Sequence, residues 1–260
     1  MSPSTGHGAP GPDLDVPDAD AAAVAGEAMP SEKVPLDRVR ILDAALLHID
    51  ESGLTGLTMR RLGQRLGVEA MSLYRYVPGK EELLDGVVET LLGEMQRDDH
   101  VLRAPDAGWQ DFLQRLAHGV RRVALAHPKA FPLVASRPPE APWLRPPLRS
   151  LEWVEDFLAG LCSEGFSDEA AVAAYRAFTS FLLGHLLLEV AAHGADVGPL
   201  DVLDDGESDD AAAQRQPTVW RLRHDLAQDH AAGEFEESLE SLLERLALTR
   251  VELSDQPRLT

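Results

Sequence analysis

The segment from Leu57 to Lys80 concentrates side chains that donate hydrogen bonds or carry positive charge, and it reads LTMRRLGQRLGVEAMSLYRYVPGK. Arg can form two parallel hydrogen bonds to a guanine, Ser is an adaptable donor and acceptor, and Met or Ala can contact a thymine methyl group. The residues of its second half that face away from a core at helical spacing are Ala70, Met71, Ser72, Tyr74, Arg75 and Tyr76. The chemistry that these residue types offer is non-covalent recognition rather than catalysis.

Two short helices must position these side chains. Thr58 suits the cap of a first helix, because its hydroxyl can accept from a backbone N–H of the opening turn. Met59, Leu62 and Leu66 recur at helical spacing and predict a small inner face. Gly67 stands where the chain must turn sharply, and a second helix is predicted from Glu69 to Tyr76, with Leu73 and Val77 facing inward. Two helices joined in this way form a helix-turn-helix, whose second helix enters the major groove of DNA.

The distribution of charge agrees with this interpretation although the net charge of the 260-residue chain is −20. From Lys33 to Lys80 there are eight Lys or Arg against five Asp or Glu, a local balance of +3. Because phosphate attraction is screened over about 10 Å at moderate salt, the local sign decides which face meets DNA. The acidic remainder is expected to repel DNA from the other faces.

The remaining sequence predicts an all-α fold. A first helix near Leu36 to Ile49 and a fourth from Lys80 to about Arg97 complete the DNA-binding unit, assigned to residues 33–80. A larger helical regulatory and dimerisation domain is expected over residues 81–250, with helices from Ser167 to about His193, from about Ala211 to Ala231 and from Phe235 to Ala247. The helix of residues 167–193 is apolar nearly all round, so one of its faces requires a partner. Together with the helix of residues 235–247 it predicts a four-helix bundle across a two-fold axis, and hence a homodimer.

Several features of the sequence bear on the order of its segments and on the cellular compartment of the protein. Residues 1–32 are rich in Pro, Gly, Ala and Asp and predict a disordered acidic tail, and residues 201–210 predict a mobile acidic loop. We find no secretory signal and expect no membrane-spanning run. Cys162 is the only cysteine and cannot form an internal disulfide, so a reducing compartment is expected. These features predict a cytoplasmic protein associated with the nucleoid, with no membrane partner.

The segment from Leu57 to Lys80 resembles the tetracycline-repressor (TetR) family of bacterial regulators. The motifs that carry the resemblance are LTMRRL at 57–62, LGV at 66–68, LYRYV at 73–77 and KEELL at 80–84. The resemblance implies that Thr58 and Arg60 approach the DNA backbone or a base edge, that residues 70–76 read the groove, and that Lys80 binds a phosphate. Arg61 is included as a residue that neutralises phosphate. FLLGH at 181–185 and EFEESL at 234–239 resemble, less sharply, the regulatory domain of the tetracycline repressors themselves.

A polar row on one helix has two interpretations. His185, Glu189 and His193 follow one another at intervals of four residues, so neighbouring pairs share a helix face. In one interpretation the row binds a divalent metal or a polar ligand. In the other these residues are polar side chains at the edge of a pocket or at a dimer seam. The second interpretation is favoured, because the two His are too far apart to bind one ion simply. No metal ligand and no cofactor is therefore assigned.

Aromatic residues of the second domain are candidates for a ligand pocket, although aromatics at helical spacing more often form ordinary core. The candidate lining is Trp109, Phe112, Leu116, Phe131, Trp153, Phe157, Phe178, Phe181, Leu182, His185 and Glu189.

The function expected from the sequence is that of a DNA-binding transcriptional regulator, a repressor released from a palindromic operator by a small molecule. One alternative is a regulator that is ligand-independent or responds to a protein, which predicts a regulatory domain without a cavity. A helical enzyme is a further alternative, but no Gly-rich phosphate loop, metal-ligand cluster or nucleophile with its base supports it, so no catalytic residue is assigned.

Overall fold

The computed structural model describes residues 35–97, 101, 105, 107–137, 141, 143–146, 150–196 and 215–254. Every regular element in these ranges is a helix, which confirms the predicted all-α class. The predicted tail at 1–32 and the predicted acidic loop at 201–210 lie outside the described residues. All elements belong to one unit that begins at Leu36.

The first three helices form a small unit with its own core. Helix α1 (Arg38–Ser52) begins at Asp37, whose side chain accepts from the Arg40 backbone N–H at 2.8 Å. Gly53 ends it at φ 75°, and a short 3-10 turn, η1 (Leu54–Gly56), leads into α2 (Met59–Leu66) and α3 (Ala70–Leu73). The buried side chains at the centre of this unit are Ile41, Ala45, Ile49, Leu57, Leu62 and Leu73.

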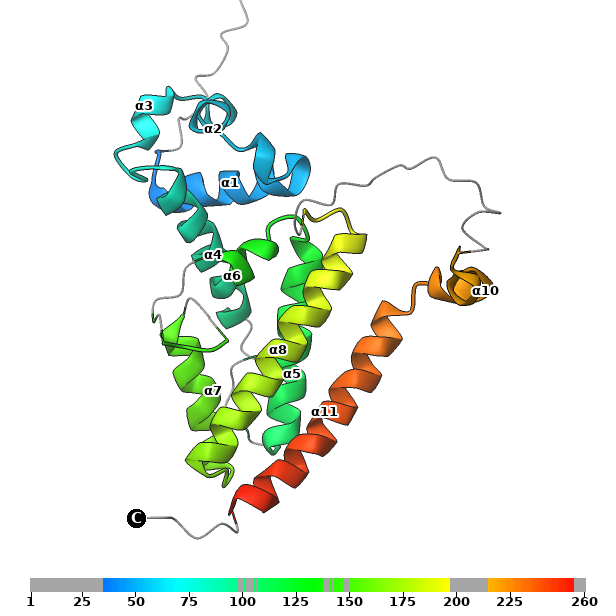
Figure 1. Ribbon diagram of the computed structural model, residues 1–260. Coiled ribbons are helices and arrows are strands. Elements are labelled where there is room, and N and C mark those ends of the chain that lie inside the picture. The colour runs from blue at the N-terminus through cyan, green and yellow to red at the C-terminus, as the bar shows by residue number, and fades with distance from the viewer. Residues whose placement is uncertain are drawn as a thin grey trace, which may run out of the picture. The chain divides into compact units, whose positions relative to one another are not determined.

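Helix α4 (Lys80–Gln96) connects this unit to the larger group of helices (Figure 1). It packs against α1 at one end and against α5 and α6 further along. Leu83, Val87 and Leu91 are completely buried, at the spacing predicted for its inner face. A single continuous helix therefore carries packing from the helix-turn-helix into the second domain.

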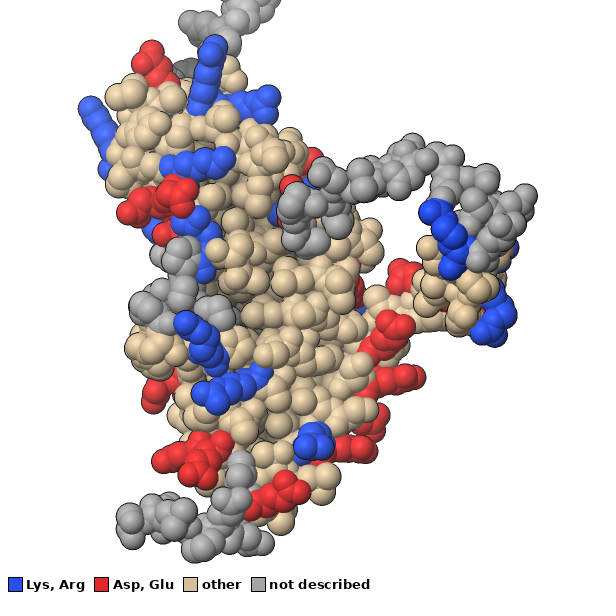
Figure 2. Space-filling view, viewed as in Figure 1, with Lys and Arg blue, Asp and Glu red and all other residues tan. Residues whose placement is uncertain are grey.

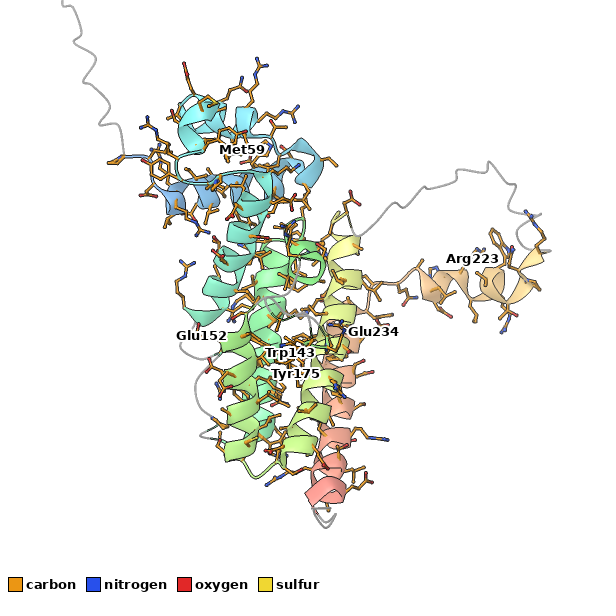
Figure 3. The ribbon with its side chains drawn as sticks, turned by 60° about the vertical axis from the view of Figure 1, so that its left-hand side comes forward. Met59, Trp143, Glu152, Tyr175, Arg223 and Glu234 are labelled. Carbon is orange, nitrogen blue, oxygen red and sulfur yellow. The ribbon has the colours of Figure 1, made fainter. Side chains whose placement is uncertain are left out.

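The larger group comprises α5 (Trp109–Ala126), α6 (Pro132–Ser136), α7 (Leu151–Ser163), α8 (Asp168–Ala192) and α11 (Ala231–Ser254). Helix α8 is central, because it packs against α5, α7 and α11. Phe157 on α7 lies at its aromatic centre, with ring centroids 6.3 Å from Phe112 and 5.4 Å from Phe178. In Figure 3, Tyr175 of α8 lies among these helices, whereas Met59 lies in the small unit of α1–α3.

Helix α8 begins at Ser167 as predicted, with the Ser167 hydroxyl accepting from the Ala170 N–H at 3.2 Å. By length and composition it is also apolar enough to cross a membrane, which the sequence analysis did not anticipate. Its contacts with α5, α7 and α11 bury part of that apolar surface. Leu188 nevertheless remains 75% exposed in the single chain.

Two boundaries near the C-terminus differ from the prediction. Helix α10 (Pro217–Leu226) is shorter than the predicted helix of residues 211–231, of which residues 211–214 are outside the described ranges. Pro217 fixes its first turn, and none of its residues is buried. Helix α11 is longer than predicted at both ends, because its Glu- and Leu-rich sequence continues to favour helix beyond Ala247.

Candidate functional site

The local geometry of α2 and α3 follows from three residues. The Thr58 hydroxyl accepts from the Arg61 N–H at 3.2 Å and caps α2 as predicted. Gly67 adopts φ 69° and ψ 29°, the left-handed conformation that a glycine provides without a steric cost. Gly63 lets α2 approach the backbone that leads into α3, because a Cβ at this position would lie 2.8 Å from the Val68 carbonyl oxygen and 3.1 Å from the Ala70 nitrogen. The pair of helices is thus locked by a cap, a left-handed turn and a missing side chain.

Helix α3 is shorter than the predicted Glu69–Tyr76. Glu69 is at its N-cap but makes no side-chain cap bond, and the regular helix ends at Leu73. Residues 74–76 continue as hydrogen-bonded turns, with Tyr76 N–H and Val77 N–H both donating to the Leu73 carbonyl at 3.0 Å. Pro78 limits any continuation beyond these turns, since Val77 before it is disfavoured in the helical conformation.

The predicted reading surface is nevertheless presented outward. Met71 is 72% exposed, Tyr74 42% and Tyr76 41%, while Leu73 and Val77 are buried beneath them. Ala70 and Ser72 are half-buried and have short side chains, so only these short side chains and the backbone are available there for contact. Figure 2 shows Lys and Arg side chains projecting around this end of the molecule, whereas Asp and Glu line the face that carries α11.

Among the basic residues of this region, the structure separates free cations from engaged ones. Arg60, Arg75 and Lys80 are exposed and form no ion pair with any described residue. Arg61, in contrast, donates to the Gly56 carbonyl at 3.0 Å. Arg65 pairs with Glu51 at the end of α1, with Nη2 2.7 Å from Oε1, and this hydrogen bond lowers the pKa of the Glu51 carboxyl. Arg61 and Arg65 thus brace α2 against the preceding elements.

A cluster around His127 connects the DNA-binding unit to the second domain. His127 follows α5; its Nδ1 lies 2.7 Å from Asp50 Oδ2 on α1, and its Nε2 lies 3.1 Å from Glu94 Oε2 on α4. Beside it the Lys129 ammonium donates to the Glu51 carbonyl at 3.0 Å. When the imidazole is protonated, both of its N–H groups donate to carboxylates. We call these five groups of α1, α4 and the α5–α6 turn the His127 clasp.

The clasp predicts a pH dependence of stability. The Asp50 hydrogen bond raises the pKa of His127 in the folded protein above its ordinary value near 6.5. The folded state therefore binds the proton more tightly, so the stabilisation is fully present below about pH 6.5 and is lost as pH rises through the raised native pKa. We expect the free energy of unfolding to fall across that window in the wild type and to change much less in His127→Gln.

Urea unfolding at a series of pH values, with the His127 imidazole followed by NMR, measures this difference. His230→Gln, at an exposed histidine before α11, is the matched control and is expected to keep the wild-type slope. A pH slope in His127→Gln equal to that of the wild type would show that the clasp contributes nothing.

A second set of ion pairs ties α4 to the chain beyond α6. Arg137 Nε donates to Asp85 at 2.7 Å, and its Nη1 lies 2.7 Å from Glu81 Oε2. Both carboxylates belong to the first half of α4, close to the helix-turn-helix. Helix α4 is therefore held both by the His127 clasp and by Arg137.

The larger helices line a small, partly open apolar cavity of about 30 Å³. It lies where α4, α5, α6, α7 and α8 converge. Its lining is Leu92, Met95, Val120, Val134, Ser150, Trp153, Thr179, Leu182 and Leu183. Two walls, Leu92 and Met95, belong to α4, so the cavity and the DNA-binding unit share one helix.

Of the eleven residues predicted for a ligand pocket, Trp153 and Leu182 line this cavity. The aromatic side chains Phe112, Phe157 and Phe178 pack on one another as core instead. Trp109 packs edge-on against Phe166 with centroids 5.1 Å apart. The other buried candidates, Leu116 and Phe131, are fully enclosed.

The seven lining residues that the sequence analysis did not select are aliphatic, thioether or hydroxyl side chains. Nothing in their sequence pattern distinguishes them from core positions, since every one falls on a helical apolar stripe or beside a helix start. Only the convergence of five helices marks them as lining.

The predicted polar row on α8 takes part in an ion pair away from this cavity. Glu189 is 6% exposed and accepts from Arg121 of α5, with Nε 3.1 Å from Oε2. That hydrogen bond raises the pKa of Arg121. His193 contacts the Glu189 backbone carbonyl at 2.9 Å, and His185 Nε2 lies 4.0 Å from Glu189 Oε2. Among the described residues no group of three potential ligands could hold a metal ion.

Phe181 and His185 lie around Phe235 of α11, with ring centroids 6.0 Å and 5.3 Å from it. The Arg121 guanidinium lies over the same ring at 5.0 Å from its centroid. These predicted pocket residues thus form the junction between α8 and α11. Arg121, Glu189 and His193 also border a larger and more open hollow of about 660 Å³, whose rim on α11 includes Glu234 and Glu237.

Comparison with known proteins agrees with this geometry. Residues 41–87 match the family model described as bacterial regulatory proteins of the tetR family, and residues 103–249 match the tetracyclin repressor-like C-terminal domain. The class D tetracycline repressor protein of Escherichia coli is 33% identical over 153 residues, which span 58% of this chain and 66% of that repressor.

Solved structures show the same fold. A possible TetR family transcriptional regulator from Streptomyces coelicolor superimposes with a TM-score of 0.65 at 31% identity, covering 82% of this chain and all of that chain. ActR from the same organism, in complex with (S)-DNPA, superimposes with a TM-score of 0.60 at 26% identity, covering 84% of this chain and all of that one. With the helix-turn-helix, the helical second domain and both family models in agreement, the chain belongs to the TetR family of bacterial transcriptional regulators.

Proposed function

We propose that the protein is a dimeric repressor that binds a palindromic operator through α2 and α3 and leaves it when a small molecule occupies the regulatory domain. The observation that carries the proposal is that α4 has its N-terminal end beside the exposed reading surface and its Leu92 and Met95 in the cavity wall. We place DNA binding in residues 33–80, regulation and dimerisation in residues 81–250, and the protein in the cytoplasm on the nucleoid.

The outward face of α8 supports a dimer. Ser180, Gly184 and Leu188 follow at intervals of four residues on this face and are all exposed in the single chain. A side chain at Gly184 would meet nothing within 4 Å, so another helix can approach closely there. Helix α11 adds Leu248 and Val251, which are 60% and 62% exposed. Paired across a two-fold axis, α8 and α11 of two chains bury these residues in a four-helix bundle.

The size of the cavity supports release by ligand-driven movement. A small-molecule site commonly measures about 300–1,000 Å³, an order of magnitude more than the space between these helices. A ligand therefore binds only when the walls separate, and α4 forms one of those walls. Because the ligand favours the expanded form, it shifts the population away from the spacing of reading helices that fits the operator.

The test is DNA binding by the purified protein. We expect Arg60→Ala and Lys80→Ala to weaken binding to all duplexes and to reduce the salt slope by about 0.9 for each lost phosphate contact, because these exposed cations neutralise phosphate. Arg75→Ala is expected to alter sequence preference as well. Fluorescence anisotropy on a library of labelled duplexes at several salt concentrations measures both effects.

The matched control is Arg221→Ala, which removes an exposed arginine from α10, outside the helix-turn-helix. It is expected to keep wild-type affinity and salt slope. Equal losses in Arg221→Ala and Arg60→Ala would place the DNA contact elsewhere and overturn the proposed interface.

A further inference from the structure

We propose that the effector of the apolar cavity is an uncharged, predominantly apolar compound that offers one hydrogen-bond acceptor to the indole N–H of Trp153. The inference rests on the proposed function, since it names the ligand class of that same site. It depends on three properties of the cavity: the absence of charge in its lining, the indole N–H of Trp153 and beside it the Thr179 hydroxyl, both unpartnered among the described residues, and its position away from the charged hollow.

The first property is the chemistry of the walls. None of the nine lining residues carries a charge, and their polar groups are two hydroxyls and one indole. An ion transferred to such surroundings loses its hydration and gains no counter-charge, which is very costly. A carboxylate, a phosphate or an ammonium group is therefore excluded from the buried part of the ligand.

The second property concerns Trp153 on α7, which is 6% exposed and lines the cavity. Its Nε1 is completely buried and has no hydrogen-bond partner among the described residues. An indole nitrogen donates and cannot accept, so only an acceptor on the ligand can satisfy it. A carbonyl, ether or hydroxyl oxygen would do so. Its hydrogen bond to the indole N–H would replace the one to water that the indole lost on folding.

The surroundings of Trp153 restrain its indole ring. Its ring stacks on Phe157 with centroids 6.1 Å apart and planes inclined by 22°. The Ser150 hydroxyl is occupied as an acceptor of the Trp153 backbone N–H at 3.2 Å, which caps α7. The indole is thus held in place while its N–H stays unused, and most of the remaining walls between α4 and α8 are aliphatic.

The third property is the contrast with the open hollow beside α11. That hollow is lined by Arg121, Glu189, His193, Asp229, His230, Glu234 and Glu237 among others, and ions can be solvated there. If the effector were charged, its site would resemble this hollow. The cavity that shares α4 with the DNA-binding unit is the uncharged one, so the ligand that acts through α4 is neutral.

Three naphthalene derivatives with the same ring test the inference by isothermal titration on the full-length protein without DNA. The probes are 2-acetylnaphthalene, with a neutral acceptor, 2-ethylnaphthalene, without an acceptor, and 2-naphthoate, with a charge. We expect the acetyl compound to bind about five- to tenfold more tightly than the ethyl compound, which is the contribution of one hydrogen bond. The naphthoate is expected not to bind measurably.

Trp153→Phe keeps an aromatic ring and removes the donor. In this variant we expect the advantage of the acetyl over the ethyl compound to fall to less than about twofold, with little change for the ethyl compound. Trp143→Phe is the matched control, because Trp143 is 75% exposed and does not line the cavity. It is expected to keep the wild-type ratio.

Tight binding of the naphthoate, no binding of the acetyl compound at millimolar concentration, or an unchanged acetyl-to-ethyl ratio in Trp153→Phe would each overturn the assignment of ligand class. A separate measurement of DNA release keeps the proposed function distinguishable. If the acetyl compound binds as expected and operator affinity does not change, the ligand class stands and the repressor mechanism fails.

Discussion

Replacing Gly63 by Ala is expected to weaken specific DNA binding strongly although it changes no residue of the proposed reading surface. The added Cβ would lie 2.8 Å from the Val68 carbonyl oxygen and 3.1 Å from the Ala70 nitrogen, and both are backbone atoms that cannot rotate away. Relief requires α2 and α3 to separate. Overpacking of this kind costs about 1–3 kcal/mol, which is a large part of the stability of so small a unit. We expect a lower thermal midpoint and a loss of operator affinity of about 100-fold.

Helix propensity alone predicts the opposite sign, because Ala in a helix is about 0.5–1 kcal/mol more stable than Gly. Gly93→Ala is therefore the matched control: Gly93 also lies within a helix, α4, and a Cβ there would meet nothing within 4 Å. It should raise the thermal midpoint slightly and leave DNA binding intact. Stabilisation by both substitutions would contradict the close approach of α2 to α3.

The second large effect is expected from Leu188→Asp. Leu188 is 75% exposed in the single chain, and in the proposed dimer it lies in the seam formed by α8 and α11. Two carboxylates facing each other across an apolar seam would have to be desolvated, so the chains should separate. A monomer binds one half-site without the second half-site held nearby, and operator affinity should fall by about 100-fold or more.

Analytical ultracentrifugation gives the mass, and anisotropy gives the affinity. The control for the mass measurement is Val39→Asp, which places the same charge at a 66%-exposed position on α1. It is expected to leave the dimer intact. If the Leu188→Asp protein sediments as a dimer, Leu188 does not lie in the dimer interface and the two chains must meet elsewhere.

The helix-turn-helix could be predicted from the sequence because its signals are local. The cap at Thr58, the left-handed turn at Gly67 and the spacing of Leu62, Leu66 and Leu73 each act within a few residues. The end of α3 was missed because the outward Tyr and Arg pattern continues to Tyr76, whereas the chain after Leu73 forms hydrogen-bonded turns.

The cavity and the engaged cations could not be predicted because they depend on residues far apart in the sequence. Arg65 is paired with Glu51 across a turn, and Arg137 reaches α4 over 52 residues. Likewise Leu92 and Thr179 become neighbours in one cavity only when α4 and α8 meet. Composition and spacing identify such positions as helical but do not determine which helices will converge.

The length of α4 has a mechanical consequence. Seventeen residues at 1.5 Å per residue make a rod of about 25 Å, with Leu92 and Met95 near one end and Lys80 at the other. If such a lever turns by about 5° at its inner end, its outer tip is displaced by about 2 Å, and two levers related by symmetry double that displacement. A rotation of about 5° at the inner end of α4 could therefore displace both reading helices from the spacing that successive major grooves of the operator require.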